Sequence, residues 1–297
     1  MPVGIALVVL AAVCFGFMPY FSRLARHDGL SVEMLLGLRF GLAAVTLLAL
    51  ALWRGGPMPR GRVLLGVIAL GAVGYVLEAW TFFTALDYAP GGVVSLLLYL
   101  YPALVTVLAR LLRNERLTRR RVAALALALA GATLIIAPGA RADDAAIRWQ
   151  GLTLGVACAA VYALYILGAS ELVPRAGAVQ AATIVVTSAA AVFLGVALAK
   201  ADPWPTTARA WTGVGSLALV CTLVPITAFL GGLARVGPVR ASTLSTIEPL
   251  ATVLAGVVLM GESLSWTQAA GGGLVLLGAA MAARGAPAPP RPDPNEP

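Results

Sequence analysis

Charged side chains are scarce in this sequence of 297 residues. Asp, Glu, Lys and Arg make up 11% of the chain, whereas hydrophobic residues make up 60%. A soluble domain carries roughly 25% charged residues, so this chain cannot assemble a water-soluble surface. The composition therefore predicts a membrane protein whose main partner is the lipid bilayer. The net charge of +8 does not indicate a nucleic-acid partner, because the basic residues lie in short gaps between long apolar runs.

The residues that most enzymes need are also scarce. The only histidine is His27, no aspartate lies in the middle of an apolar run, and neither HExxH nor GxSxG occurs. These absences argue against an intramembrane enzyme, so we expect no catalytic residues. No Walker A motif and no soluble domain are present, which excludes an ATP-driven pump on this chain.

Cysteine is rare as well. The chain has three cysteines, all inside apolar runs and without CxxC or metal-ligand spacing: Cys14, Cys158 and Cys221. This pattern is typical of small core residues. We therefore expect no metal site and no cofactor.

Long apolar runs account for most of the chain. Ten runs have about the length needed to cross a bilayer, near residues 3–21, 32–53, 62–84, 90–109, 121–137, 150–170, 178–199, 211–233, 239–260 and 265–283. The first run lacks a preceding basic segment and a following cleavage site, so we expect a retained helix rather than a signal peptide. The Pro-rich polar tail at 285–297 is predicted to be disordered.

An internal repeat divides the chain. A shift of 147 positions aligns Ser95 with Ser242 and Pro102 with Pro249. The repeat predicts two five-helix units at 1–145 and 146–284. Because each unit has an odd number of spans, the second must enter the membrane from the opposite side. The expected fold class is an all-α membrane protein with ten transmembrane helices arranged as two inverted five-helix repeats, a design typical of secondary transporters.

The distribution of Lys and Arg predicts the orientation. With the N-terminus inside, fourteen basic residues fall on the cytoplasmic side and six on the other. The positive-inside rule then predicts a multi-pass protein of the cell inner (plasma) membrane with both termini in the cytoplasm.

Three sequence features resemble a known family over residues 3–283. They are the proline-centred helices YLYPALVTVLARLLRNERL and STIEPLATVLAGVVLMGESL, and the arginine of LGLRFGLAA in the second span. The chain resembles the drug/metabolite transporter superfamily, EamA type, and within it the bacterial amino-acid and metabolite exporters, which include an exporter of aromatic amino acids. The resemblance implies export of small organic metabolites, amino acids above all and aromatic or hydrophobic ones among them, by alternating access. The alternatives are export of drugs or other metabolites, and a non-transporting scaffold or receptor.

The substrate cavity is expected at the depth of the two mid-span prolines, Pro102 and Pro249. Each proline lacks an N–H and disturbs the carbonyl four residues earlier, on Leu98 and Ser245 respectively, which makes polar backbone available there. A polar stripe of the ninth span is expected to line the cavity, or instead to hydrogen-bond neighbouring helices. It consists of Ser242, Ser245 and Thr246.

Three ionisable residues lie inside the spans, where charge is costly and function is the first hypothesis. Arg39 and Glu78 are predicted to lie at matching depth, either as an ion pair that joins the second and third spans or as a charge-selective outer gate. Glu248 has no cation at its own depth. It would contact a substrate ammonium group, carry a proton, or donate to a carbonyl near Pro249.

Tyrosines in the third, fourth and sixth spans are the remaining candidates for the cavity. They are Tyr75, Tyr99, Tyr101 and Tyr162, for which core packing is the alternative. Small residues in the fifth and tenth spans, such as Ala124, Ala128 and Gly278, predict close helix packing or a dimer contact. Monomer and homodimer both remain open.

Overall fold

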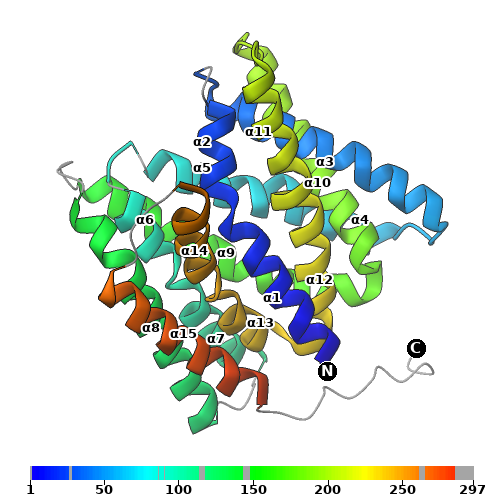
Figure 1. Cartoon of the computed structure of the whole chain (residues 1–297). Helices are drawn as coiled ribbons and strands as arrows, with labels where there is room; N and C mark the ends of the chain where they lie inside the picture. Colours follow the sequence, from blue (N-terminus) through cyan, green and yellow to red (C-terminus); the bar gives the residue numbers. More distant parts are fainter. Residues whose placement is uncertain are drawn as a thin grey trace, which may run out of the picture.

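The computed structural model describes residues 2–26, 29–85, 87–89, 91–113, 118–142, 148–260 and 265–284. Within these ranges every regular element is a helix (Figure 1). Ten helical stretches are long and apolar enough to cross a membrane: Pro2–Ala25, Val32–Trp53, Gly61–Ala85, Val93–Arg113, Arg119–Ala137, Trp149–Ala176, Ala178–Ala199, Ala208–Val236, Pro238–Leu259 and Trp266–Arg284. The predicted all-α class with ten spans is confirmed. The predicted tail at 285–297 lies outside the described residues.

The described elements divide between the two halves of the chain. The first comprises α1 (Pro2–Gly16), α2 (Met18–Ala25), α3 (Val32–Arg54), α4 (Gly61–Ala69), η2 (Leu70–Tyr75), α5 (Val76–Ala85), α6 (Gly91–Leu98), α7 (Tyr101–Arg113) and α8 (Arg119–Ala142). The second comprises α9 (Trp149–Ala176), α10 (Ala178–Ala199), α11 (Ala208–Ala218), η3 (Leu219–Leu223), α12 (Val224–Val236), α13 (Pro238–Ser245), α14 (Glu248–Met260) and α15 (Trp266–Arg284).

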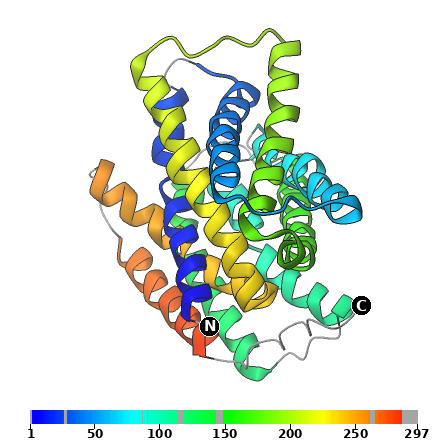
Figure 2. The ribbon, with the colours of Figure 1, turned by 90° about the vertical axis from the view of Figure 1, so that its right-hand side faces the viewer.

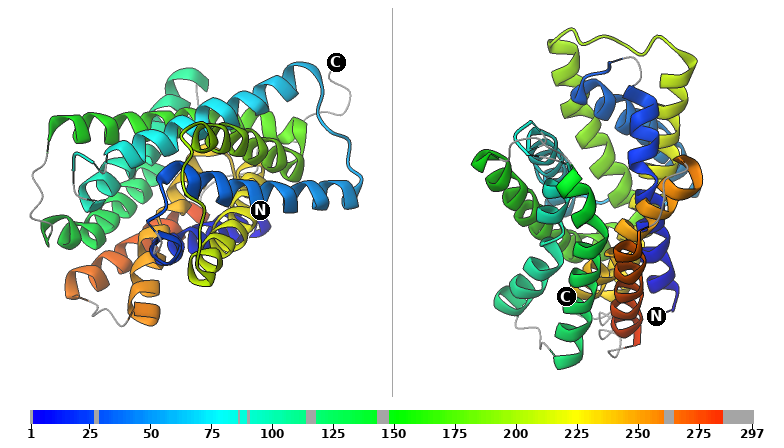
Figure 3. Two further views of the ribbon diagram at one scale, coloured as in Figure 1. Left: turned by 90° about the horizontal axis from the view of Figure 1, so that it is seen from above. Right: turned by 60° about the vertical axis from the view of Figure 1, so that its left-hand side comes forward.

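Helix packing follows the repeat. Two helices pack on their own repeat equivalents, α3 on α10 and α8 on α15. The other principal contacts are reciprocal, because α1 packs on α12 and α9 packs on α5. Figure 2 shows α1 (blue) beside α12 (yellow), and the right-hand view of Figure 3 shows α8 (green) beside α15 (dark red). Five spans in each half, with exchanged contacts, give the inverted arrangement expected from the sequence.

Small residues allow α8 and α15 to pack closely. A Cβ atom on Gly131 would lie 2.6 Å from the Gly271 carbonyl oxygen, and one on Gly278 would lie 2.7 Å from the Ala124 carbonyl oxygen. The packing role predicted for the fifth and tenth spans is therefore confirmed.

Both proline-containing spans break where the sequence predicts. α6 ends at Leu98 and α13 ends at Ser245, the two residues whose carbonyls the prolines were expected to disturb. Each break is bridged by a tight turn, with Leu100 N donating to Leu97 O (3.1 Å) and Ile247 N donating to Leu244 O (3.2 Å). The turns let α7 and α14 begin near the middle of the fourth and ninth spans.

Two π-helical segments, η2 and η3, occupy corresponding places in the third and eighth spans. Such segments widen a helix by one residue and free backbone groups, and they are frequent at functional sites. At η2, a Cβ atom on Gly71 would lie 2.4 Å from the Val185 carbonyl oxygen, so only glycine allows α10 to approach this closely. The sequence pattern did not predict either segment.

Candidate functional site

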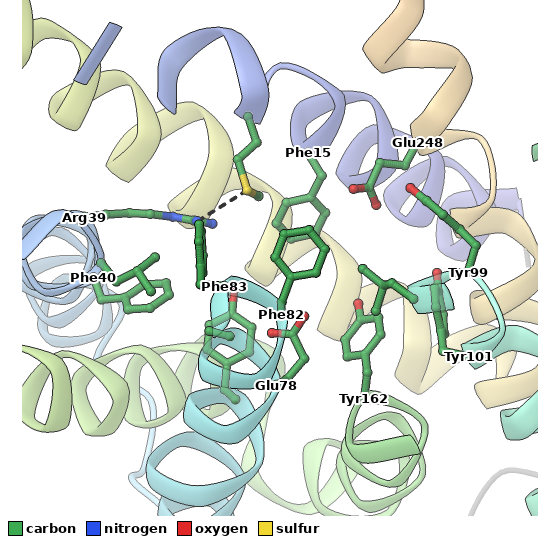
Figure 4. A pocket seen from close by; sticks show the side chains of 15 residues that line it. Phe15, Arg39, Phe40, Glu78, Phe82, Phe83, Tyr99, Tyr101, Tyr162 and Glu248 are labelled. Carbon is green, nitrogen blue, oxygen red and sulfur yellow. Dashed lines mark hydrogen bonds between the residues drawn. The ribbon is translucent and has the colours of Figure 1, made fainter. Parts of the chain in front are cut away.

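A cavity of about 150 Å³ lies between the first three spans, α9 and the breaks in the fourth and ninth spans (Figure 4). A buried water needs roughly 10–15 Å³ on this measure, so the cavity has room for a small organic molecule. Its walls are Phe15, Met18, Leu36, Arg39, Phe40, Tyr75, Glu78, Ala79, Phe82, Phe83, Leu98, Tyr99, Tyr101, Tyr162 and Glu248.

Glu248 is the first residue of α14, directly after the turn that breaks the ninth span. Its carboxylate points toward the Tyr99 hydroxyl at the cavity wall (Figure 4). The positive end of the helix dipole favours a carboxylate at this position. The Glu248 carboxyl and the Tyr99 hydroxyl form a side-chain hydrogen bond. Glu248 therefore faces the cavity, next to a residue of the first repeat.

Glu78 follows η2 on α5 and also reaches the cavity. Its carbonyl oxygen accepts a hydrogen bond from the Cys158 thiol at 3.3 Å, which joins α5 to α9. The carboxylate remains on the cavity side, below Phe82 in Figure 4. The cavity thus has two acidic side chains, one from each repeat.

Arg39 is buried and its partners differ from the expected one. Its Nε donates to Thr222 Oγ1 at 2.6 Å, its Nη2 to the Cys221 carbonyl at 2.9 Å, and its Nη1 to the Met18 sulfur at 3.4 Å. The predicted ion pair with Glu78 is not found between these two described residues. The reason is η3, whose widened turn offers the Cys221 carbonyl and the Thr222 hydroxyl to the guanidinium. Arg39 thus joins α3 to the second repeat rather than to the third span.

The tyrosines form a connected wall. Tyr101 contacts Tyr162 with ring centroids 4.6 Å apart, and Tyr99 lies 6.2 Å from Tyr101. Tyr75 contacts Phe40 at 5.3 Å. All four tyrosines proposed from the sequence line the cavity. Seven further apolar residues line the cavity and were not among the sequence candidates: Phe15, Met18, Leu36, Phe40, Ala79, Phe82 and Phe83.

The remaining sequence candidates lie behind the wall. Pro102 and Pro249 are buried next to the helix breaks and shape the backbone. The hydroxyls of the polar stripe donate to carbonyls of their own helix, Ser242 to Val239 (3.0 Å), Ser245 to Ala241 (3.0 Å) and Thr246 to Thr243 (2.6 Å). These five residues are not among those that line the cavity, but Ser245 also forms a side-chain hydrogen bond with Tyr101 of α7, which does.

Within the described ranges, no group of three or more His, Cys, Asp or Glu side chains could hold a metal ion. The cavity lining contains two carboxylates, one guanidinium and eight aromatic rings.

Ten spans in two exchanged halves around a central, mixed-charge cavity define a polytopic membrane protein of the secondary-transporter type. The chain belongs to the EamA-like transporter family, whose model matches residues 2–137 and again 149–284. The resemblance inferred from the proline-centred spans is thereby confirmed at the family level.

Two similar proteins are described as transporters. The chain is 30% identical over 286 residues to an uncharacterized transporter of Archaeoglobus fulgidus, covering 95% of this chain and 96% of that protein. It is 24% identical over 279 residues to the uncharacterized transporter YcbK of Bacillus subtilis, covering 91% and 89%. A solved crystal structure with 23% identity covers 94% of this chain and 96% of its own, with a TM-score of 0.78, which supports the fold. The protein is thus a transporter, and the scaffold or receptor alternative is set aside.

Proposed function

We propose that this transporter exports small organic metabolites, amino acids above all, across the cytoplasmic membrane by alternating access. One observation carries the proposal: a single cavity holds Arg39 opposite the carboxylates of Glu78 and Glu248, between aromatic walls. An amino acid presents a carboxylate, an ammonium group and an often apolar side chain, so each part meets a complementary surface.

Arg39 keeps donors for a substrate. A guanidinium has five N–H groups, and three of them are used by Thr222, Cys221 and Met18. One N–H remains on each Nη atom. This pair of donors suits a substrate carboxylate, which accepts two parallel hydrogen bonds from such a fork.

The helices are closely packed on the side of the cavity that we assign to the cytoplasm. Met18, Phe82 and Phe83 line the cavity on the side we assign to the exterior. On the other side, every residue of α13 is buried. There Arg113, at the end of α7, bonds the Ser170 hydroxyl at 2.6 Å and Glu171 at 2.9 Å, which ties α7 to α9. Cytoplasmic termini and insertion in the inner membrane belong to the same proposal.

Counterflow in proteoliposomes tests the substrate class. Liposomes containing the full chain are loaded with one unlabelled compound, and uptake of labelled aromatic amino acids, nucleosides and cationic dyes is compared. We expect amino-acid exchange that Arg39→Met abolishes. Exchange of amino acids at the rate of protein-free liposomes would contradict the proposal.

Export of hydrophobic cations is the second candidate. The lining has two acidic side chains but one basic one, and its eight aromatic rings can hold a cation on their faces. Exchange of a cationic dye that survives Arg39→Met but not Glu248→Gln would favour this candidate over amino acids.

A further inference from the structure

A second, small cavity lies between α8, α13 and α15, away from the substrate cavity. Its volume is about 10 Å³, and it is lined by Arg121, Ala124, Val239, Arg240, Thr243 and Ala282. Two of these six side chains carry a guanidinium and none is acidic. This volume has room for about one water-sized atom.

Arg240 reaches this cavity with an unsatisfied donor. Its side chain is 9% exposed, and its Nη2 atom is buried without a hydrogen-bond partner. An unpaired buried donor on a charged group costs more than a neutral one, so an acceptor in the adjoining space would stabilise the protein. A single oxygen atom with negative charge satisfies both the size and the charge of this space.

The position corresponds to the level of lipid head groups. Arg121 lies in the first turn of α8, and Ala282 lies in the last turn of α15, at the ends of their spans. Three further arginines near these ends are exposed: Arg119, Arg120 and Arg284. Basic pockets between transmembrane helices on the cytoplasmic side of a membrane, to which we assign these helix ends, are suited to anionic head groups.

We propose that Arg121 and Arg240 form a phosphate-binding site in which one phosphoryl oxygen occupies the cavity between α8, α13 and α15. The rest of the phosphate group lies outside, because the cavity admits no more than one oxygen. Charge-assisted hydrogen bonds from two guanidinium groups suit this anion. The phosphate comes from an anionic phospholipid or from free phosphate, and the site stabilises the contact of α13 with α8 and α15.

Thermal unfolding of the purified full chain in a neutral detergent tests the site. The melting temperature is followed during titration with short-chain phosphatidylglycerol, short-chain phosphatidylcholine or sodium phosphate at constant ionic strength. We expect protection by phosphatidylglycerol and none by phosphatidylcholine. Protection by sodium phosphate at similar concentrations assigns the site to free phosphate, and its absence assigns the site to the lipid head group.

Variants separate this site from a general basic surface. Arg240→Met should raise the concentration needed for half-protection by about fivefold or more, the effect expected of one interfacial cation. Without anion it should melt no lower than the wild type, because it removes an unsatisfied donor. Arg121→Gln should weaken protection in the same way. It replaces Arg240→Met as the test if that variant does not fold.

Arg119→Gln is the matched control, because it removes one exposed arginine next to the site. It should leave half-protection unchanged. Equal protection of Arg240→Met, Arg121→Gln and the wild type would overturn the proposal, and so would an equal loss in Arg119→Gln.

Discussion

Glu248 and Tyr101 occupy equivalent positions in the two repeats, since a shift of 147 relates them. Each is the first residue after its helix break, beginning α14 and α7 respectively, and each lines the cavity. The same backbone geometry therefore presents a carboxylate from one repeat and a phenol from the other. The polarity of the cavity comes from side chains that the repeats do not share.

Replacing Glu248 tests whether this carboxylate acts on the substrate. Glu248→Gln keeps the size and removes the charge, so folded protein should insert normally. Transport of an amino acid should fall about tenfold or more, because hydrogen bonds to a charged group contribute roughly 1.5–3 kcal/mol. Initial rates of counterflow at several pH values measure the effect. If Glu248 carries a proton, the pH dependence of the wild type should disappear in the variant.

Asp87→Asn provides the control, because Asp87 is exposed and does not line the cavity. It should transport at close to the wild-type rate. A Glu248→Gln variant with wild-type rates and an unchanged pH profile would leave this carboxylate without a role in transport.

Arg39 is expected to couple energetically with Thr222 rather than with Glu78. Thr222→Val preserves the shape but removes the acceptor of a 2.6 Å hydrogen bond to a buried guanidinium. The cost should be about 2 kcal/mol. Double-mutant cycles on melting, with Arg39→Met as the shared change, should give non-additivity for Arg39 with Thr222 and near-additivity for Arg39 with Glu78. The opposite pattern would restore the ion pair expected from the sequence.

At the scale of elements, the sequence predicted what local rules determine. The ten spans follow from apolar length, and the breaks at Leu98 and Ser245 follow from the missing N–H of a proline four residues later. What a polar stripe on a helix contacts depends on how the helices pack and not on the sequence near it. Ser242, Ser245 and Thr246 follow one side of α13 and its C-terminal cap, but the sequence does not say what that side meets. All three hydroxyls donate to backbone carbonyls three or four residues earlier, and Ser245 also bonds Tyr101 of α7.

The π-helical segments also depend on packing and not on a local motif. η2 is fixed where Gly71 meets the backbone of α10, and no pattern within the third span encodes that neighbour. The partner of Arg39 could not be predicted for the same reason, because the Cys221 carbonyl is offered to it by η3. Charge matching alone favoured Glu78.

Contact between α8 and α15 gives a prediction about stability. A methyl group on Gly271 would lie 2.7 Å from the Gly131 carbonyl oxygen, so Gly271→Ala must push the helices apart. We expect the melting temperature in detergent to drop, with a cost of about 1–3 kcal/mol.

Gly273 lies on the same helix and has no atom within 4 Å of an added Cβ. Gly273→Ala should therefore leave the melting temperature unchanged or raise it slightly, since alanine is the better helix former by up to about 1 kcal/mol. Equal melting temperatures for the two variants would mean that the α8–α15 contact does not limit stability.

At the scale of the whole molecule, the two repeats share a backbone plan and differ in charge. Glu78 aligns with Pro225 and Arg39 aligns with Val186, so the second repeat lacks both ionisable groups of the first. Among the described residues of the second half, only Glu248 contributes charge to the cavity. We therefore expect a substrate to meet different charges on the two sides of the cavity, although the two halves share one backbone plan.

The inverted arrangement makes a prediction that equivalent loops face opposite sides of the membrane. Met58, between α3 and α4, aligns with Pro205 between α10 and α11, and Trp204 beside it is 50% exposed. Met58 is itself 41% exposed, so a cysteine at either position would be accessible to a reagent.

In right-side-out membrane vesicles, a membrane-impermeant maleimide should label Trp204→Cys directly and Met58→Cys only after the membrane is opened. The unsubstituted chain gives the background from Cys14, Cys158 and Cys221, which all lie within spans. Labelling of both variants from the outside would place equivalent loops on one side of the membrane and contradict the inverted arrangement. Labelling of Met58→Cys from the outside, with Trp204→Cys protected, would contradict the proposed cytoplasmic termini.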